Sequence, residues 1–482
     1  MKRKLVLILF FLLLLSSGLT VPFPHFPSEE KQALAQTCRD NDSICSKGCT
    51  LENDNDCPPT VEYYKTSYQT LKDHLVDTNR IQIMTEKTVL SEHGNSNIVG
   101  DKVFSGHMGG FWAPPFFSAG ITAENGFHMG LGFYDRDSGN YKWEEESDLA
   151  TEAFWYPSKM VVTKTYPGGD KDHQITGTKV TIPGYRAFGL KLKVENVGTK
   201  PSHMNILFFV SIPGVKRLTT QTHYGWIWGE KDCDGSNFCS STGIAEKDND
   251  FFVLFNAEEQ FCMGLGIGKP AGSWRIVNGD SRSRKNLIND FTDDGRLSST
   301  DEDGPSNGTI IGIIYEAPET NPNESYTVPF VAVIEQSAGL NECKRKLRNS
   351  YNYIIDQDIE RMADDYWNTR LEQMYSQLPH LEIGDERLKR IYHNSSLHLS
   401  LNKLQADDLI TGNFGYDSYY SLASFFGKSM GEFPWADARH SYVRALTDPD
   451  GLKHQIIKYL NLESSNPEAC RAYDPVAGNH FM

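Results

Sequence analysis

The amino-acid sequence predicts a large antiparallel β-sandwich followed by a helical domain, and three observations support this fold class. Between residues 97 and 337, short runs of alternating or β-branched residues recur between Gly, Asn, Asp and Pro. From residue 338 onward, apolar residues recur instead at spacings of three and four. Because strands repeat every two residues and helices every 3.6, this change of period indicates a change from sheet to helix. The third observation is the length of 482 residues, which allows two or three domains.

Residues 1–21 have the pattern of a secretory signal peptide. Lys2-Arg3-Lys4 is basic, the run from Leu5 to Leu15 is apolar, and Ser16-Ser17-Gly18 supplies small residues. This apolar run is shorter than a membrane-spanning helix requires. We therefore expect a secreted or extracytoplasmic protein, with an uncleaved N-terminal anchor as the alternative.

The charge balance argues against some classes of partner. The formal net charge is −16, from 47 Lys and Arg and 63 Asp and Glu. Such a protein is repelled by nucleic acid and by anionic membrane surfaces. The sequence therefore predicts no nucleic-acid partner and no membrane contact beyond a possible N-terminal anchor.

Nine cysteines behind a signal peptide predict disulfides. Residues 22–60 are interpreted as a disulfide segment, since they hold Cys38, Cys45, Cys49 and Cys57. The Asp residues between these cysteines are either solvated turn carboxylates or Ca²⁺ ligands, and their spacing does not match an EF-hand. A loop-closing pair is suggested by Cys233 and Cys239. Cysteines with no obvious partner are Cys262, Cys343 and Cys470.

Residues 61–96 are expected to form a helical or irregular connector, with a helix over 61–77. The β domain then spans 97–337. Its clearest strand patterns are SKMVVTKTY, GTKVTIPG, AFGLKLKVENV, MNILFFVSIPG, DFFVLFNA, GTIIGIIYEA and YTVPFVAVIEQ. Period-two patterning between turn residues is typical of an antiparallel sandwich. At about 240 residues the domain is large for one sandwich, which favours a supersandwich.

No residue pattern in the β domain predicts a cofactor or a metal. The glycine-rich run 264–268 lacks the helix and the acidic residue that follow in a dinucleotide-binding site. Three histidines, at positions 107, 128 and 223, lack the spacing of metal ligands. We therefore expect no cofactor and no metal.

Residues 338–380 are expected to be linker helices, and a helical domain follows over 381–482. Its first helix is predicted at about 386–406, and a second begins near residues 433–439. A third helix is expected over about 448–462. The apolar stripe of the first helix is expected to contain Leu388, Ile391, Tyr392, Ser395 and Leu399. The apolar face of the second is expected to contain Tyr442, Val443 and Leu446.

The connection between the first two of these helices carries the candidate site. It is rich in aromatic residues and closes on Trp435, Asp437 and Arg439 at a helix start. A carboxylate there is stabilised by free backbone N–H groups, so Asp437 stays ionised and accepts hydrogen bonds from vicinal hydroxyls. Trp435 offers a flat face to the C–H face of a sugar, and Arg439 orients the carboxylate or donates directly. The alternative is that Trp435 is core and Asp437 an ordinary helix-start residue.

Over about 60 residues this segment resembles the (α/α)6-toroid, or six-hairpin, glycosidases, especially the glucoamylase/glucodextranase-like group. That group has a helix, a Gly-rich loop, an aromatic-Trp-x-(Arg)-Asp segment and a helix. Here the order differs, because Asp437 precedes Arg439. The resemblance implies a β-supersandwich packed on a helical toroid, with the Trp and the acidic residue holding the sugar. Further sugar contacts are expected from Tyr416, Asp417 and Glu432.

The resemblance implies a glycoside hydrolase that acts on α-glucan or a related oligosaccharide by acid/base hydrolysis. Twelve helices need on the order of 300 residues, whereas about 98 follow residue 384. We therefore expect the start of an incomplete toroid, with exposed apolar helix faces and no hydrolytic activity. The general acid and base are unknown, since no residue matches the later motifs. One alternative is a non-catalytic, secreted carbohydrate-binding or cell-surface protein. Another is a mutarotase-like epimerase using the β domain alone, but no His/Glu constellation for it stands out.

Overall fold

The structure is a computed structural model of the 482-residue chain. The residues that it describes are 49, 51, 57–67, 80–93, 110–113, 116–117, 128–144, 150–166, 172–212, 216–217, 243–278, 281–301, 308–379, 385–401, 403–404, 418–419, 421–422, 430–431, 434–465, 472–473 and 480–481.

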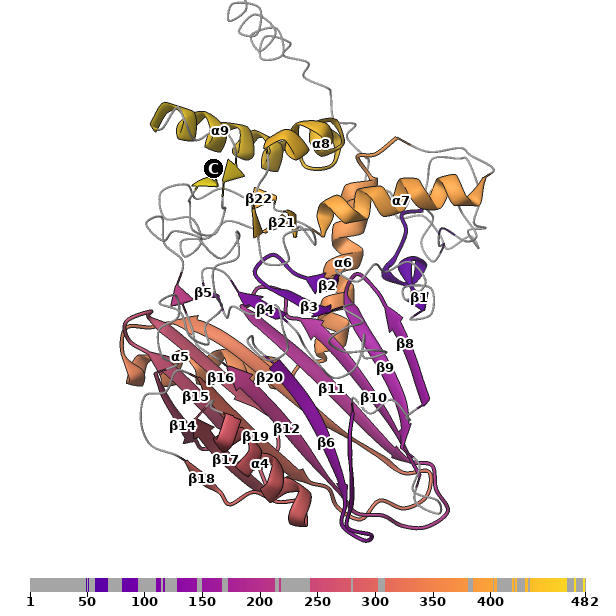
Figure 1. The fold of residues 1–482 in the computed structure, drawn as a ribbon. Coiled ribbons are helices and arrows are strands. Elements are labelled where there is room, and N and C mark those ends of the chain that lie inside the picture. The colour runs from indigo at the N-terminus through magenta and orange to yellow at the C-terminus, as the bar shows by residue number, and fades with distance from the viewer. Residues whose placement is uncertain are drawn as a thin grey trace, which may run out of the picture.

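Two large sheets packed face to face form the body of the molecule (Figure 1). The nine-stranded sheet consists, in spatial order, of β1 (Thr66–Ser67), β8 (Ala150–Trp155), β9 (Lys159–Tyr166), β10 (His173–Thr181), β11 (Ala187–Asn196), β20 (Ser325–Gln336), β16 (Phe261–Gly266), β15 (Phe251–Asn256) and β14 (Ile244–Asp248). The six-stranded sheet consists of β18 (Thr300–Asp301), β17 (Ser273–Asn278), β19 (Thr309–Glu316), β12 (Met204–Ile212), β6 (His128–Asp135) and β7 (Asn140–Trp143). All strand pairs in the two sheets are antiparallel except β17 with β18.

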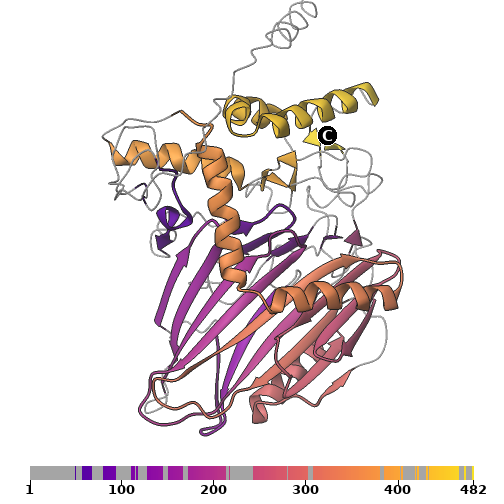
Figure 2. The same cartoon turned by 180° about the vertical axis from the view of Figure 1, so that it is seen from behind.

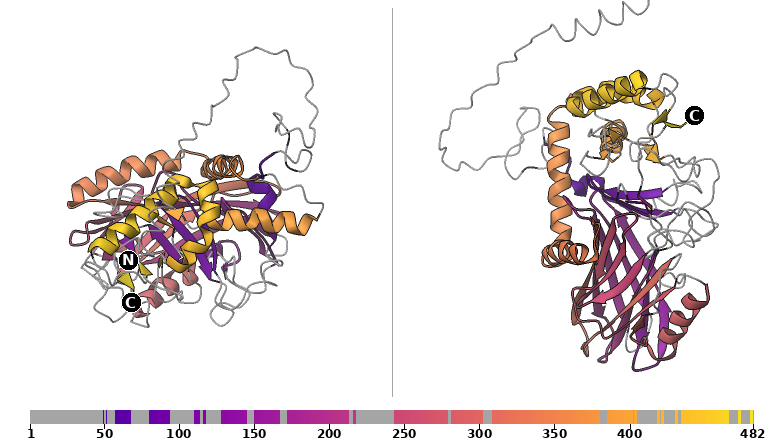
Figure 3. Two further views of the ribbon diagram at one scale, coloured as in Figure 1. Left: turned by 90° about the horizontal axis from the view of Figure 1, so that it is seen from above. Right: turned by 90° about the vertical axis from the view of Figure 1, so that its left-hand side faces the viewer.

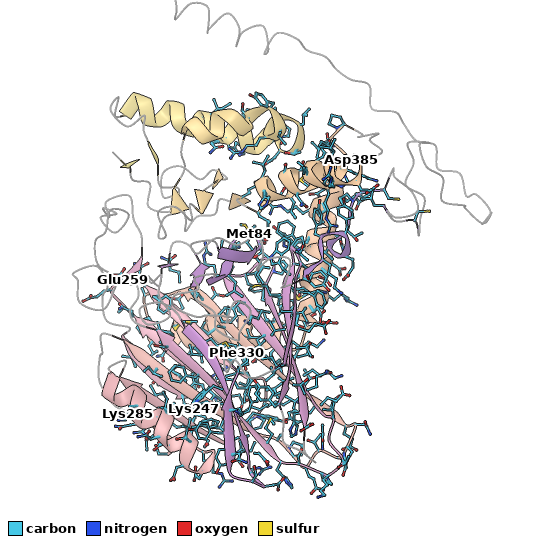
Figure 4. All side chains as sticks on the ribbon, turned by 45° about the vertical axis from the view of Figure 1, so that its right-hand side comes forward. Met84, Lys247, Glu259, Lys285, Phe330 and Asp385 are labelled. Carbon is cyan, nitrogen blue, oxygen red and sulfur yellow. A yellow bond between two sulfur atoms is a disulfide. The ribbon has the colours of Figure 1, made fainter. Side chains whose placement is uncertain are left out.

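The main hydrophobic core lies between these two sheets. Every second residue of a strand points to the same face, so the alternating runs deliver one row of apolar side chains inward from each strand. At the centre, Phe330 of β20 stacks on Phe208 of β12 with ring centroids 5.7 Å apart. Figure 4 shows Phe330 in the middle of the sandwich. The predicted fold class is thereby confirmed for the β domain.

Helices cover the outer faces of both sheets, as the side view in Figure 3 shows. On the nine-stranded sheet lie α5 (Leu340–Ile355) and α6 (Ile359–Tyr375), which pack with Leu347 and Ala363 against residues such as Val331. On the six-stranded sheet lies α4 (Ser281–Asp294), whose Leu287 and Phe291 are fully buried. Helices α5 and α6 both lie within the segment 338–380, where helices were expected, whereas α4 was not predicted.

A five-stranded sheet lies at the end of the sandwich that faces the helical region (Figure 1). Its order is β13 (Lys216–Arg217), β5 (Phe116–Phe117), β4 (Gly110–Ala113), β3 (Val89–His93) and β2 (Arg80–Met84). Helix α6 rises beside it (Figure 2), and the fully buried Trp367 donates its indole N–H to the carbonyl oxygen of Met84 at 2.9 Å. This bond joins the helical linker to the small sheet.

Three helices follow the linker: α7 (Glu386–Ser400), α8 (Pro434–Thr447) and α9 (Pro449–Ser465). The Asp385 carboxylate caps α7 by accepting from the backbone N–H groups of Arg387 and Leu388. Short two-stranded ribbons accompany these helices: β21 (Lys403–Leu404) with β22 (Ser418–Tyr419), β23 (Ser421–Leu422) with β24 (Met430–Gly431), and β25 (Ala472–Tyr473) with β26 (His480–Phe481). The helical part of the predicted fold class is therefore present, and α7 ends six residues earlier than expected.

Three expectations need correction. Residues 80–84 and 89–93, inside the connector expected over 61–96, form strands β2 and β3. The helix expected over 61–77 is, where described, the short 3-10 helix η1 (Val61–Tyr64) followed by β1, and residues 68–77 lie outside the described part. Cys262 and Cys343, which have no obvious partners in the sequence, form a disulfide with each other. Cys49 and Cys57 are also disulfide-bonded, as expected for the N-terminal segment. Among the described residues, no helix is long and apolar enough to cross a membrane.

Candidate functional site

The start of α8 forms the centre of the candidate site. Because α8 begins at Pro434, Trp435 and Asp437 lie in its first turn and Arg439 follows in the second. Proline suits the first helical position, where no intrahelical partner exists for the missing N–H. The free N–H groups of this turn favour a nearby carboxylate. The predicted helix start is confirmed, while the side chains of these three residues lie outside the described part.

Two β ribbons shape the connection between α7 and α8. In the first, Lys403 pairs with Tyr419 and Leu404 with Ser418. In the second, Ser421 pairs with Gly431. Of the other sequence-predicted site residues, Tyr416 and Asp417 come directly before β22, and Glu432 follows β24. These three residues lie outside the described part of the chain.

An ion pair ties this connection to the corner between α8 and α9. The Lys403 ammonium lies 2.6 Å from the Asp448 carboxylate, and both side chains are about one-fifth exposed. The same carboxylate accepts a hydrogen bond from the backbone N–H of Gly451 at 3.2 Å, so it also caps α9. Asp448 therefore couples the base of the α7–α8 connection to the start of α9.

A buried polar contact fixes α8 against α9. The Arg444 guanidinium donates to the side-chain oxygen of Gln455, and these residues are only 4% and 1% exposed. Burial of a charged group requires such a partner, because an unpaired guanidinium in the interior is strongly destabilising. Sequence reasoning missed Arg444 and Gln455 as well as Lys403 and Asp448. For Arg444 and Gln455, the signal that could have found them is the placement of a polar residue among apolar positions on each of two consecutive helices.

A cluster of aromatic side chains joins the short helix η1 to α7. The Tyr63 hydroxyl lies 3.0 Å from Nδ1 of His393, and the Tyr375 hydroxyl donates to the His393 carbonyl oxygen at 2.8 Å. Burial, with a smaller contribution from the nearby Lys389 charge, lowers the pKa of His393 to about 4. The imidazole is therefore neutral at neutral pH and acts here as a packed, hydrogen-bonded ring. Its place on α7, against Tyr63 of η1, indicates a structural role.

In the described part of the chain, no group of three or more His, Cys, Asp or Glu side chains that could hold a metal ion occurs. Within these residues, the observed chemistry is that of hydrogen bonds, ion pairs and aromatic contacts.

No protein-family model and no curated protein matches this chain. Solved structures do resemble it. One is a protein described as a kojibiose phosphorylase from the human microbiome, with 10% sequence identity and a TM-score of 0.52 over 84% of this chain and 50% of that one. A bacterial glucoamylase complexed with acarbose has 11% identity and a TM-score of 0.47, over 81% of this chain and 50% of that one. A protein described as an aldose 1-epimerase, from Escherichia coli K12, has 11% identity and a TM-score of 0.31 over 54% of this chain and 99% of that one.

This chain thus spans half the length of the first two structures. At such low sequence identity the likeness concerns the fold alone. It confirms the resemblance expected from residues 384–446 and extends it to most of the chain. The protein therefore shares its fold, an antiparallel β-sandwich followed by helices, with half of the structure described as a kojibiose phosphorylase.

Proposed function

We propose that this protein is the sugar-binding N-terminal portion of an exported glycoside hydrolase that acts on α-glucan or a related oligosaccharide. The observation that supports the proposal most directly is the start of α8 at Pro434. It puts Trp435 and Asp437 in one helical turn with free N–H groups, which favour an ionised carboxylate. An aromatic face for the C–H side of a sugar beside an acceptor for its hydroxyls is a suitable binding pair.

The remaining contacts belong to the same proposal. Arg439 orients Asp437 or donates to the sugar, and Tyr416, Asp417 and Glu432 extend the site from the ribbons before α8. Glycosidic cleavage needs an acid to protonate the leaving oxygen and a second carboxylate to act as base or nucleophile. We assign neither role to a residue of this chain, so we expect the 482-residue protein to bind oligosaccharide without hydrolysing it.

The test is calorimetric titration of the 482-residue protein with malto- and isomalto-oligosaccharides. Trp435→Ala is expected to weaken binding about fivefold, as loss of a stacked aromatic surface costs roughly 1 kcal/mol. Asp437→Asn is expected to weaken it about tenfold or more, since hydrogen bonds to charged groups contribute roughly 1.5–3 kcal/mol. Unchanged affinity in both variants would contradict the proposed site.

Two substitutions serve as matched controls. Asp450 lies in the first turn of the next helix, α9, and is exposed, so Asp450→Asn changes a similar carboxylate away from the proposed site. Tyr141 is 43% exposed on β7 of the sandwich, and Tyr141→Ala removes an aromatic surface there. Both controls are expected to keep the affinity of the unaltered protein.

A second set of measurements separates a catalytic from a purely binding function. Because one structure of similar fold is described as a phosphorylase, the assay is run with and without inorganic phosphate. Release of free glucose or of a sugar phosphate by the 482-residue chain would overturn the expectation that it is inactive. Sugar binding without turnover is also what the alternative predicts, a secreted carbohydrate-binding protein. A longer form of the protein that cleaves the bound sugar would favour the hydrolase.

A further inference from the structure

Two stacked tyrosine rings lie on the surface of the sandwich, away from the start of α8. Tyr185 lies in the connection between β10 and β11, and Tyr353 belongs to α5. Their ring centroids are 5.8 Å apart, and the ring planes differ by 29°. Because Tyr353 is still 50% exposed, the face of its ring that does not meet Tyr185 is open to solvent. Figure 1 shows α5 along the sandwich and α8 beyond the five-stranded sheet.

The connection that carries Tyr185 has a fixed backbone. The N–H of Tyr185 donates to the carbonyl oxygen of Ile182 at 3.2 Å, which closes a four-residue turn. Pro183 and Gly184 lie at its centre, and the φ of +82° at Gly184 is that of a type II turn. From the neighbouring β2–β3 connection, the Thr88 hydroxyl donates to the Tyr185 carbonyl oxygen at 3.1 Å. The ring of Tyr185 is therefore carried on a tight, anchored turn.

The helix that carries Tyr353 is anchored as firmly. The disulfide between Cys343 and Cys262 fastens α5 to the nine-stranded sheet. Two residues before Tyr353, the buried Tyr351 accepts a hydrogen bond from the backbone N–H of Gly268 at 2.9 Å. Both rings are thus positioned before a ligand arrives, which lowers the entropy cost of binding.

A carboxylate adjoins the two rings. Ser350, one turn before Tyr353 on α5, donates its hydroxyl to the Glu335 carboxylate at 2.5 Å. Burial, then Tyr353 and then the Glu335 charge raise the pKa of the Tyr185 hydroxyl above its usual value. That hydroxyl therefore keeps its proton and can donate, while the carboxylate accepts. A donor and an acceptor accompany the open aromatic face.

We propose that Tyr185, Tyr353 and Glu335 form a second sugar-binding site, the tyrosine platform, for a pyranose unit of an oligo- or polysaccharide. The open ring face suits the C–H face of a pyranose, and the donor and acceptor suit its hydroxyls. The expectation that the sugar belongs to an α-glucan rests on the proposed function, whereas the platform itself does not. Because it lies away from the start of α8, the platform holds a second part of a long chain or a second chain.

The small size of the patch favours a sugar over a protein partner. Along α5, all of which the structure describes, Tyr353 is the only large apolar side chain that is exposed. A stable protein interface buries on the order of 800 Å² on each partner, far more than one tyrosine ring offers. A single sugar ring matches the area of one aromatic face.

The first experiment measures protection of Tyr353 by sugar. The 482-residue protein is nitrated with tetranitromethane, without and with maltoheptaose, and the modified peptides are quantified by mass spectrometry. Tyr141, which is 43% exposed on β7, is the control within the same molecule. Maltoheptaose is expected to slow modification of Tyr353 several-fold and to leave that of Tyr141 unchanged, because the stacked sugar covers the ring.

The second experiment measures binding of variants to a polymer. Retardation of the protein in native gels that contain glycogen gives the affinity. Tyr353→Ala is expected to weaken retardation about fivefold, through loss of a stacked aromatic surface. Glu335→Gln is expected to weaken it too, through loss of a charged acceptor. Tyr141→Ala is the matched control, and equal urea midpoints verify that each variant is folded.

The outcomes separate the platform from the proposed site at α8. Trp435→Ala is expected to leave the protection of Tyr353 unchanged, so each site can fail without the other. Absence of protection by maltoheptaose, isomaltoheptaose and cellohexaose alike would overturn the platform. Protection by cellohexaose alone would support the platform and contradict the α-glucan of the proposed function. Protection without sugar that increases with protein concentration would overturn the sugar assignment and give the surface to a second copy of the chain.

Discussion

Cys262 of β16 and Cys343 of α5 form a fully buried disulfide, with Cα atoms 5.6 Å apart, which fastens the linker helix to the nine-stranded sheet. The bond closes a segment with a sequence separation of 81 residues. The chain-entropy argument gives a stabilisation of about 4 kcal/mol for a loop of this length. We expect the Cys262→Ala plus Cys343→Ala variant to lose about that much free energy of unfolding, measured by urea denaturation. Asn349→Ala, at an exposed position of α5, is the control, and equal stability of all three proteins would contradict the prediction.

The burial of His393 predicts acid sensitivity. Its pKa is lowered from 6.5 to about 4 by burial and then by Lys389, so the folded state keeps the ring neutral. Between these two values the unfolded chain binds a proton that the folded chain does not. The stability contribution of His393 is therefore present above about pH 6.5 and is lost as the pH falls toward about 4.

His393→Gln tests this dependence. The variant is expected to show a smaller change in urea midpoint between about pH 7.5 and about pH 4.5 than the unaltered protein. Some dependence should remain, because burial also lowers the pKa of His398. An identical pH profile in variant and parent would show that the aromatic cluster around His393 does not favour the neutral ring.

Because an ion-pair network joins the sandwich to α6, two substitutions within it are expected to change the free energy of unfolding non-additively. The ammonium of Lys159, a residue 6% exposed, lies 3.0 Å from Glu360 and 2.7 Å from Asp364. Burial alone would lower the pKa of Lys159, but hydrogen bonds and charges from the two carboxylates raise it overall. Lys159→Met is expected to lower the free energy of unfolding by about 1–3 kcal/mol. This is less than for a fully buried pair, because the carboxylates are partly exposed.

The double variant Lys159→Met plus Asp364→Leu should recover part of that loss, because it leaves fewer unpaired charges. Arg361 and Asp365 form an exposed pair on the same helix and provide the comparison. Arg361→Ala is expected to cost under about 1 kcal/mol. Strict additivity of the Lys159 and Asp364 substitutions would mean that the two groups are not coupled.

The Lys403–Asp448 ion pair predicts an effect on sugar binding without a large effect on stability. Lys403→Met removes the ion pair between β21, at the start of the α7–α8 connection, and Asp448, which lies between α8 and α9. A partly exposed pair contributes about 0.2–1 kcal/mol, so we expect affinity for oligosaccharide to fall by up to about fivefold. Titration of this variant beside Lys453→Met, an exposed position of α9, is the measurement. Equal affinities for the two variants would show that Lys403 does not position the site.

Seven strands of the sandwich and most helices were predictable because each has a clear periodic pattern, whereas β2 and β3 lie in the segment expected to be a connector. The runs MNILFFVSIPG and YTVPFVAVIEQ became β12 and β20, which face each other through Phe208 and Phe330. Helix α4 was missed because its sequence, between two strands, is mostly polar. Only a few of its residues, among them Leu287 and Phe291, pack against the six-stranded sheet. The start of α8 was predictable from Pro434, although the residues that hold the helix in place were not.

Spacing alone determined that 386–400 and 434–447 are amphipathic helices, but the tertiary structure decided which side of each is buried. Leu388 and Tyr442 belong to predicted apolar faces and are exposed, as expected for an incomplete toroid, but the burial of Arg444 on α8 was not expected. Periodicity reports only which residues share a side of a helix, and burial depends on what packs against that side. The pairing of Cys262 with Cys343 has the same origin, because only the fold brings residues so distant in sequence together.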